Sequence, residues 1–181
     1  MKYKNKTYSA RRPPKILILG PPCSRKYEIA EIIAKKFNII HVSISDLLNK
    51  ELKSHNDNSN TILNCLNSGE LVPDKYVFKL LEDRLCASDC MINGWILTGF
   101  PKTPSQLHYI DQINPSFKPS LIVMIEHEFK TVEERSNMRR IDPLTAKVYY
   151  INSKEFSKES PAVAHRLVTK TEDKPEVFKK R

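Results

Sequence analysis

Short apolar runs alternate with amphipathic segments along this chain, and this alternation restricts the possible folds more than any other feature. The runs span residues 15–19, 38–43, 95–98 and 120–126. Between the first two runs, apolar residues recur at helical spacing, at Ile29, Ile32, Ile33 and Phe37. Strands that alternate with helices predict an α/β fold in which a parallel β-sheet is flanked by helices on both faces.

Ligands of such sheets bind where the carboxyl ends of the strands meet. This edge would collect four segments, namely residues 20–26, 43–46, 99–106 and the stretch after Ile125. Helices are expected at 61–67 and 129–140, and the polar stretch 54–60 is expected to be a loop. Arg139 and Arg140 would then lie in the last turn of a helix, where cations suit the helix dipole.

Length and composition favour one globular domain. The chain has 181 residues, of which 40% are hydrophobic and 28% charged, enough for one sizeable core and too few residues for two ordinary domains. Its apolar runs are far shorter than the roughly 20 residues of a membrane span, and no secretory signal is visible, so no membrane partner is expected. Four scattered cysteines indicate a reducing compartment such as the cytoplasm. Cys86 and Cys90 have no second pair beside them, so we predict no metal site.

The net charge of +9 is concentrated at the N-terminus. Residues 1–15 contain six lysines and arginines and no acid, and Pro13 and Pro14 end this stretch. We therefore divide the chain into a flexible basic arm, residues 1–13, and one domain, residues 14–181. A basic arm can bind nucleic acid, but a solvated tail is the simpler interpretation, and nucleic acid is not the expected partner.

The segment GPPCSRK, residues 20–26, lies between the first strand and the first helix. A phosphate-binding loop uses this position, because backbone N–H groups and the helix amino terminus attract phosphate. The pattern G-x-x-x-x-G-K-[ST] is only partly met, since Arg25 replaces the glycine before Lys26 and Tyr27 follows the lysine.

Six segments, in order and at suitable separations, resemble the adenylate kinase family of nucleoside-monophosphate kinases. They are GPPCSRK, HVSISDLL, SGELVPD, GWILTGFPKTPSQ, RSNMRRIDPLTAKVYY and RLVTKTEDKPEVFKKR, and the resemblance covers residues 14–181. It implies a P-loop kinase fold with a lid at about 141–168, and phosphoryl exchange between ATP and AMP with Mg²⁺. The stretches GWILTG and RRIDPLTAKVYY are most similar to ciliary members that carry two such domains. This similarity implies a cytoplasmic location, with the cilium or axoneme as the finer expectation.

The resemblance also implies site residues. Those for catalysis are Lys26, Arg135, Arg139, Lys170 and Arg181. Those for the ATP phosphates are Gly20, Pro22, Lys26 and Arg139, to which we add Arg25, whose guanidinium could replace lost loop amides. Those for AMP are Val72, Gly99, Lys102 and Gln106. An active enzyme would use ATP and Mg²⁺, and an inactive one would need no cofactor.

Departures from the family concentrate in the phosphate loop. Cys23, Arg25 and Tyr27 stand where the family has glycines. At any of these positions that needs left-handed backbone, a side chain costs about 1–2 kcal/mol. A β-carbon there also fills space that phosphate needs.

Further departures remove charge and hydrogen-bonding groups from the site. Glu28 replaces a threonine that meets phosphate and metal, and Thr98 replaces the aspartate that organises Mg²⁺. Asn49 and Ile44 replace an arginine and a threonine that meet AMP, and lysines replace arginines at positions 102 and 170. Several such losses, each commonly worth ~10²–10³ in rate, would bring a kinase close to the uncatalysed rate.

Three hypotheses follow. The favoured one is a degenerate adenylate-kinase domain that serves as a binding or structural module of a larger assembly, with protein partners and with adenine nucleotides bound weakly or not at all. The second is an active, atypical nucleotide kinase, and the third is a basic nucleic-acid-binding protein. The family continues past the position of Arg181 into another strand and helix, so we expect a longer chain or a neighbour to complete the sheet.

Overall fold

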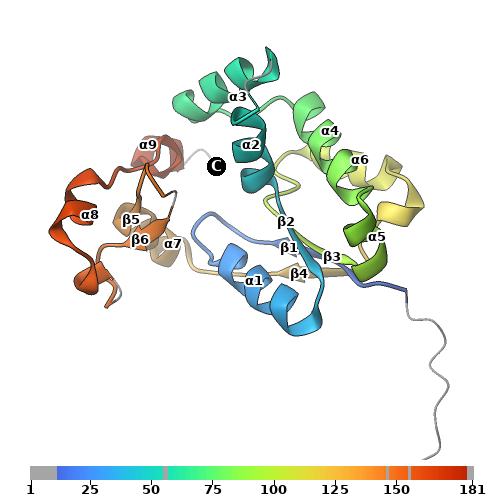
Figure 1. Cartoon of the computed structure of the whole chain (residues 1–181), viewed down its shortest axis with the longest axis horizontal. Helices are drawn as coiled ribbons and strands as arrows, with labels where there is room; N and C mark the ends of the chain where they lie inside the picture. Colours follow the sequence, from blue (N-terminus) through green and yellow to red (C-terminus); the bar gives the residue numbers. More distant parts are fainter. Residues whose placement is uncertain (1–11, 55–56, 146, 155, 179–181) are drawn as a thin grey trace, which may run out of the picture.

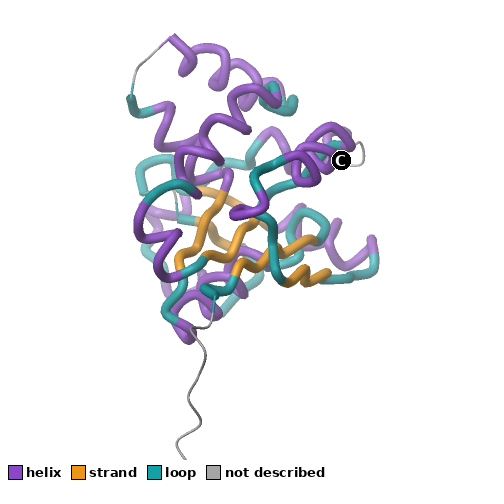
Figure 2. Tube along the Cα trace, turned by 90° about the vertical axis from the view of Figure 1, so that its right-hand side faces the viewer, coloured by secondary structure: helices purple, strands orange, loops and turns teal. Residues whose placement is uncertain are grey.

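A computed structural model describes residues 12–54, 57–145, 147–154 and 156–178. At its centre lies a four-stranded parallel sheet (Figure 1). Its spatial order is β2 (Ile40–Ser43), β3 (Trp95–Thr98), β1 (Lys15–Leu19) and β4 (Leu121–Met124). Helices lie on both sides of these strands, as the side view in Figure 2 also shows. The predicted α/β fold is therefore confirmed.

The helix that follows β1 packs closely on one face of the sheet. This helix, α1 (Lys26–Phe37), buries Ala30 and Ala34 against a cluster that includes Ile18 and Ile96. The predicted helix is thus confirmed, but three of the apolar residues that suggested it, Ile29, Ile32 and Phe37, are exposed. The physical reason is that alanine lets the helix axis approach the sheet, so the small residues take the inner positions.

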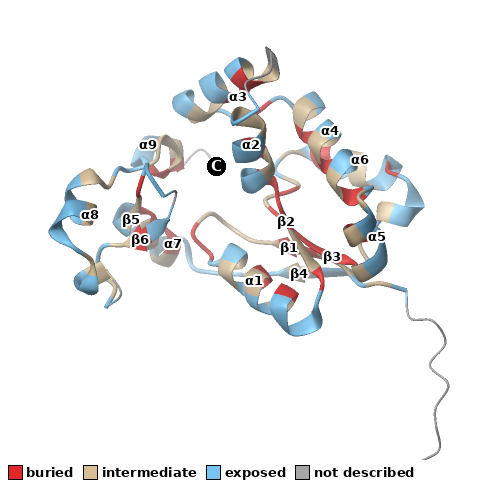
Figure 3. Cartoon of the chain, viewed as in Figure 1, coloured by how far each residue is buried: buried red, intermediate tan, exposed pale blue. Residues whose placement is uncertain are grey.

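The other face of the sheet carries the larger core. Leu17, Val42 and Leu97 point into it from three strands, and Trp95 and Phe100 are almost completely buried there. Five helices cover this face or extend from it (Figure 3): α2 (Ile44–Leu52), α3 (Asp57–Ser68), α4 (Asp74–Leu85), α5 (Ser88–Asn93) and α6 (Pro104–Gln112).

The expected loop at residues 54–60 is wrong over its second half, because α3 begins at Asp57. The Ser59 hydroxyl donates to the backbone carbonyl of Glu51 at 2.9 Å, which joins the first turn of α3 to α2. The burial of Ile62 in the core adds to this attachment. Both contacts are tertiary, so the polar local sequence did not indicate them.

A smaller region follows β4. It contains α7 (Phe129–Met138), a hairpin of β5 (Arg139–Ile141) and β6 (Val148–Tyr150), α8 (Pro161–Arg166) and α9 (Pro175–Phe178), with 3-10 turns at Phe156–Lys158 and Thr171–Asp173. Another 3-10 turn, Pro115–Phe117, precedes β4. The prediction that Arg139 and Arg140 end a helix is wrong, because their backbones pair with Tyr150 and Tyr149 in the hairpin.

A buried ion pair and a backbone bridge fix this smaller region. Asp142 is completely buried and accepts from Arg166 Nε and Nη2 at 2.8 and 2.6 Å. These bonds and one from the Thr145 hydroxyl hold the pKa of Asp142 well below its usual range. Ile141 and Val168 exchange two backbone hydrogen bonds, so residues 141 and 168 meet at one point.

One edge of the central sheet remains open to solvent in the described part of the chain. The β4 residues Leu121, Ile122 and Met124 are each more than half exposed, at 53%, 58% and 58%. Helices therefore cover both faces of the sheet at β1, β2 and β3, but they cover β4 incompletely. None of the described helices has the length and apolar character needed to cross a bilayer.

The close approach of α1 to the sheet leads to a prediction. Replacing Ala30, which has no exposed surface, by leucine should lower the free energy of unfolding by about 1–3 kcal/mol because the interface has no room for the added atoms. The matched variant Lys35→Leu, at an exposed position of the same helix, should change it by less than about 0.5 kcal/mol. Urea denaturation measures both, and equal stability of the two variants would contradict this packing.

Candidate functional site

The loop between β1 and α1 lies at the carboxyl edge of the sheet. Its first residue, Gly20, lies close to the residue that follows β4, so that an added β-carbon would be 2.9 Å from the carbonyl oxygen of Ile125. Cys23 and Arg25 have left-handed backbone, with φ of 58° and 62°. Both residues stand where the sequence comparison expected glycine, so the left-handed strain anticipated for this loop is present at two positions. Tyr27, the third such position, lies in the first turn of α1.

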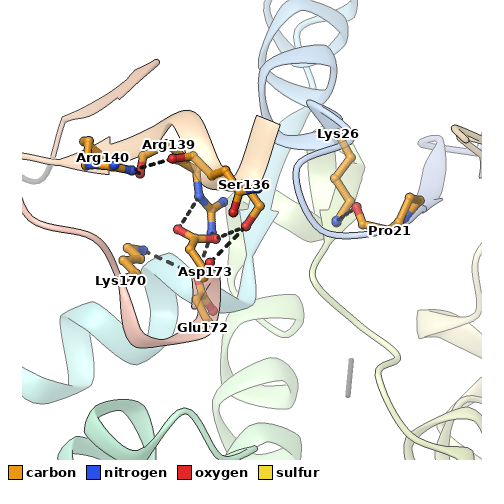
Figure 4. A network of polar contacts seen from close by, with 9 residues as sticks. Pro21, Lys26, Ser136, Arg139, Arg140, Lys170, Glu172 and Asp173 are labelled. Carbon is orange, nitrogen blue, oxygen red and sulfur yellow. Dashed lines mark hydrogen bonds and ion pairs between the residues drawn. The ribbon is translucent and has the colours of Figure 1, made fainter. Parts of the chain in front are cut away.

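Lys26 folds back over this loop. Its Nζ donates to the carbonyl oxygens of Gly20 and Pro21 at 3.1 and 2.8 Å (Figure 4). Burial is the main cause that lowers the pKa of Lys26 to about 8, and the nearby cations Lys102 and Arg139 act in the same direction. Several positive groups therefore face one another here, and a bound anion would relieve their repulsion.

The loop also contains a hydroxyl that lacks a partner. Ser24 is 1% exposed, and its Oγ has no hydrogen-bond partner among the described residues. This Oγ lies 3.1 Å from the place where a β-carbon of Gly20 would stand, so it points back towards the first residue of the loop. A buried hydroxyl without a partner is costly, and a phosphate oxygen would satisfy it.

Arg25 lies beside Glu28 in the structure. Arg25 Nε is 3.9 Å from Glu28 Oε1, and the two side chains are 58% and 43% exposed. An exposed pair at this separation contributes little to stability. The guanidinium that we expected to replace lost loop amides thus has a carboxylate of its own chain as its neighbour.

Arg139 is held by acids of its own chain (Figure 4). Its Nε donates to Asp173 Oδ2 at 2.8 Å, and its Nη2 donates to Asp173 Oδ1 at 2.6 Å and to Glu172 Oε1 at 3.1 Å. The Asp173 side chain is only 1% exposed and also accepts from the hydroxyl of Ser136. This arginine, which the sequence comparison assigned to the ATP phosphates, is therefore a partner in a buried ion pair.

Of the other predicted cations, Arg135 contacts the same loop. Arg135 Nη1 donates to the carbonyl oxygen of Cys23 at 3.5 Å and contacts His127 Nε2 at 3.2 Å, which connects α7 to the loop. Lys170 Nζ lies 3.8 Å from Glu172 Oε1. Arg181 lies outside the described residues.

The residues expected to bind AMP lie near the ends of β3 and α6. The buried Gln106 donates from Nε2 to Asp74 Oδ1 at 2.7 Å, and its Oε1 accepts from the backbone N–H of Lys102 at 2.7 Å. Gly99 faces Ile44, and Val72 is part of the core. Sequence reasoning missed Asp74, although an acid directly after Pro73 is a common helix start.

A chain of contacts that sequence reasoning missed crosses the strand ends. Thr98 Oγ1 is 3.0 Å from His41 Nε2, the His41 ring packs edge-on against Tyr27 with centroids 4.7 Å apart, and the Tyr27 hydroxyl donates to Asp46 Oδ2 at 3.0 Å. Burial lowers the pKa of His41, which favours the neutral imidazole. Uncharged groups therefore occupy the end of β3.

These residues do not fit a dedicated Mg²⁺ site. Mg²⁺ prefers carboxylates and water in octahedral geometry. Thr98 offers a hydroxyl that His41 already contacts, Glu28 lies beside Arg25, and Asp46 accepts from Tyr27. Among the described residues, no three His, Cys, Asp or Glu side chains gather closely enough to hold a metal ion.

The strain at Arg25 can be measured. Within a helix or strand, a protein with glycine has a free energy of unfolding about 0.5–1 kcal/mol lower than the same protein with alanine. At φ 62° this order should reverse, so Arg25→Gly should be more stable than Arg25→Ala by about 1 kcal/mol. Chemical denaturation compares the two variants, both of which lose the exposed pair with Glu28. An alanine variant as stable as the glycine variant would show that the loop is not strained at this position.

Comparison with known proteins agrees with this geometry. The family model described as adenylate kinase matches residues 18–181. The chain is 31% identical over 169 residues to the probable adenylate kinase 2, chloroplastic, of Oryza sativa subsp. japonica, covering 93% of this chain and 57% of the rice protein. It is 31% identical to the chloroplastic adenylate kinase of Zea mays, covering 93% and 74% of the two chains. It is 30% identical to the adenylate kinase of Francisella tularensis subsp. novicida, covering 92% and 76%.

The chain thus spans little more than half of the rice protein and about three quarters of the other two. The family model nevertheless covers the phosphate loop from its preceding strand onward, the rim of the sheet and the region that contains Arg135 and Arg139. This chain belongs to the adenylate kinase family.

Proposed function

We propose that this chain is an adenylate-kinase domain that binds the phosphates of adenine nucleotides weakly and has lost most of its phosphoryl-transfer activity. In this proposal it acts as a binding or structural module. The observation that carries the proposal is the loop itself, in which Cys23 and Arg25 place side chains on left-handed backbone around Lys26. Such a loop retains a cation and a helix amino terminus, which are sufficient to attract an anion.

Loss of transfer activity follows from the electrostatics of the reaction. Phosphoryl transfer depends on cations that neutralise charge in the transition state, with little covalent work by the protein. The Nε and Nη2 groups of Arg139 can serve this role only by leaving Asp173, and breaking a buried ion pair typically costs about 3–5 kcal/mol. That cost weakens any contribution of this arginine to catalysis.

Activity provides the direct test. In a coupled assay with ATP, AMP and Mg²⁺, we expect the purified chain to turn over at less than about 1 s⁻¹, below the usual range of kinases. The variant Cys23→Gly/Arg25→Gly/Tyr27→Gly/Glu28→Thr restores the family's loop residues and should raise the rate at least about tenfold. The same variant with Lys26→Ala is the control and should lose the gain.

Two outcomes of this assay decide between the candidate functions. Turnover of the unchanged chain above about 1 s⁻¹ would contradict the proposal and would favour the second candidate, exchange of phosphoryl groups between ATP and AMP. The relatives that are 30–31% identical and are named adenylate kinases support this second candidate. The nucleic-acid hypothesis has no comparable support.

Binding should depend on pH through Lys26. Its protonated form attracts phosphate, and its pKa of about 8 places the loss of this charge just above neutral pH. ATP affinity should therefore fall as pH rises from 7.5 to 9.5, and binding near pH 8.5 should take up part of a proton because the anion raises the pKa. Calorimetry in two buffers of different ionisation enthalpy measures this uptake. Lys26→Arg, which stays charged, should remove the uptake, and a pH-independent affinity of the unchanged chain would contradict the role of Lys26.

Three finer parts of the proposal concern the rest of the molecule. Residues 141–168 would act as the lid over the loop, and residues 1–13 would form a basic arm outside the domain. The described parts of 141–168 include the hairpin and α8, which have few buried residues and so could move as a unit. Protein partners in a larger assembly, and a cilium or axoneme as its location, stay predictions.

A further inference from the structure

We propose that the phosphate loop takes its polyphosphate as the metal-free anion, so that Mg²⁺ weakens nucleotide binding to this chain. The inference rests on the proposed function, because it concerns the ligand of the same loop. In nucleotide kinases, metal ions usually bridge the phosphate oxygens and neutralise their charge. The effect of Mg²⁺ on nucleotide binding proposed for this chain is the opposite.

The first argument is the charge around the loop. Lys26 reaches over the loop, Lys102 lies near enough to lower the pKa of Lys26, and the guanidinium of Arg135 contacts the Cys23 carbonyl. A polyphosphate without metal carries its full negative charge to this cluster. Mg²⁺ cancels part of that charge before binding, so the attraction between the cluster and the ligand becomes weaker.

The second argument is that the carboxylates in contact with this region already have partners. Asp173 binds Arg139 through two hydrogen bonds, and Glu28 lies beside Arg25. Asp46 accepts from the Tyr27 hydroxyl. A magnesium ion carried in by the nucleotide would have to compete with these partners for the carboxylate oxygens, directly or through water.

The third argument concerns the end of β3, which lies beside the loop because β1 and β3 pair in register. Ile18, two residues before Gly20, is opposite Thr98. The side chain at this strand end is the hydroxyl of Thr98, which contacts His41, and Tyr27 packs against that imidazole. Neutral groups at this point do not hold hydrated Mg²⁺ as a carboxylate does.

The buried hydroxyl of Ser24 points to a phosphate ligand independently of these charges. Its Oγ lies beside Gly20 at the start of the loop and has no hydrogen-bond partner among the described residues. A hydroxyl can donate to a phosphate oxygen, and it is a poor substitute for a carboxylate as an anchor for Mg²⁺. The loop therefore offers donors and positive charge and lacks an anionic group of its own that is not already paired.

Calorimetry with the full chain tests the inference. ATP is titrated at constant ionic strength, once with EDTA and once with Mg²⁺ in excess, and inorganic tripolyphosphate serves as a probe without a base. We expect the metal-free forms of both ligands to bind at least about threefold more tightly than their Mg²⁺ complexes. Equal or tighter binding of the Mg²⁺ complexes would overturn the inference and would leave the proposed weak nucleotide binding intact. Absence of heat with either form at millimolar ligand would overturn both.

A pair of variants at the strand end sharpens the test. Thr98→Asp introduces a carboxylate where the strand meets the loop, and should shift the ratio of the two affinities at least about threefold towards the Mg²⁺ complex. Thr98→Asn is the matched control, since it has nearly the same shape without the charge, and should keep the ratio of the unchanged chain. Circular dichroism checks that both variants fold. If this buried position does not tolerate aspartate, the Mg²⁺ dependence of the unchanged chain still decides the question. A folded Thr98→Asp variant with an unchanged ratio would contradict the role of the strand end.

Discussion

The parallel register of β2, β3 and β1 is the constraint on which the rest of this structure depends. It places Ser43 opposite Thr98 and Thr98 opposite Ile18, so three segments distant in sequence end at one edge of the sheet. The segments that supply the polar side chains of this edge begin where these three strands end. The loop starts after β1, α2 starts directly after β2, and the stretch with Gly99 and Gln106 starts after β3. The family relationship then explains why these endings carry residues that suit phosphate.

The electrostatics of the site are those of a domain that neutralises its own charges. Arg139 is satisfied by Asp173 and Glu172, and Arg25 lies beside Glu28. An enzyme that moves phosphoryl groups keeps its arginines available for the substrate, because their contribution is needed only in the transition state. Internal pairing stabilises the ground state of the empty protein, which favours a stable fold over catalysis. The proposed loss of activity would therefore follow from the contacts of these particular residues.

Local patterns in the sequence predicted the strands, most helices and the place of the loop, because periodicity and turn residues act over short distances. They also indicated strain at Cys23 and Arg25, since glycine has a specific backbone use. They could not indicate that Tyr27 contacts Asp46 and that His41 contacts Thr98, which depends on strand order. For the same reason the start of α3 and the place of Arg139 in a hairpin were predicted wrongly, since tertiary partners decide both.

The bridge between Ile141 and Val168 has a consequence for how this region can change in evolution. Because both ends of the stretch meet at one pair of backbone hydrogen bonds, residues between them can be added or removed without moving the central sheet. Asp142 and Arg166 lie just inside these ends and hold them together from within. The stretch is therefore closed at its base, where the pairing of β6 with β5 also holds it, and its remaining surface is free to diverge while these attachments stay fixed. Such a stretch is a natural place for related proteins to acquire different partners.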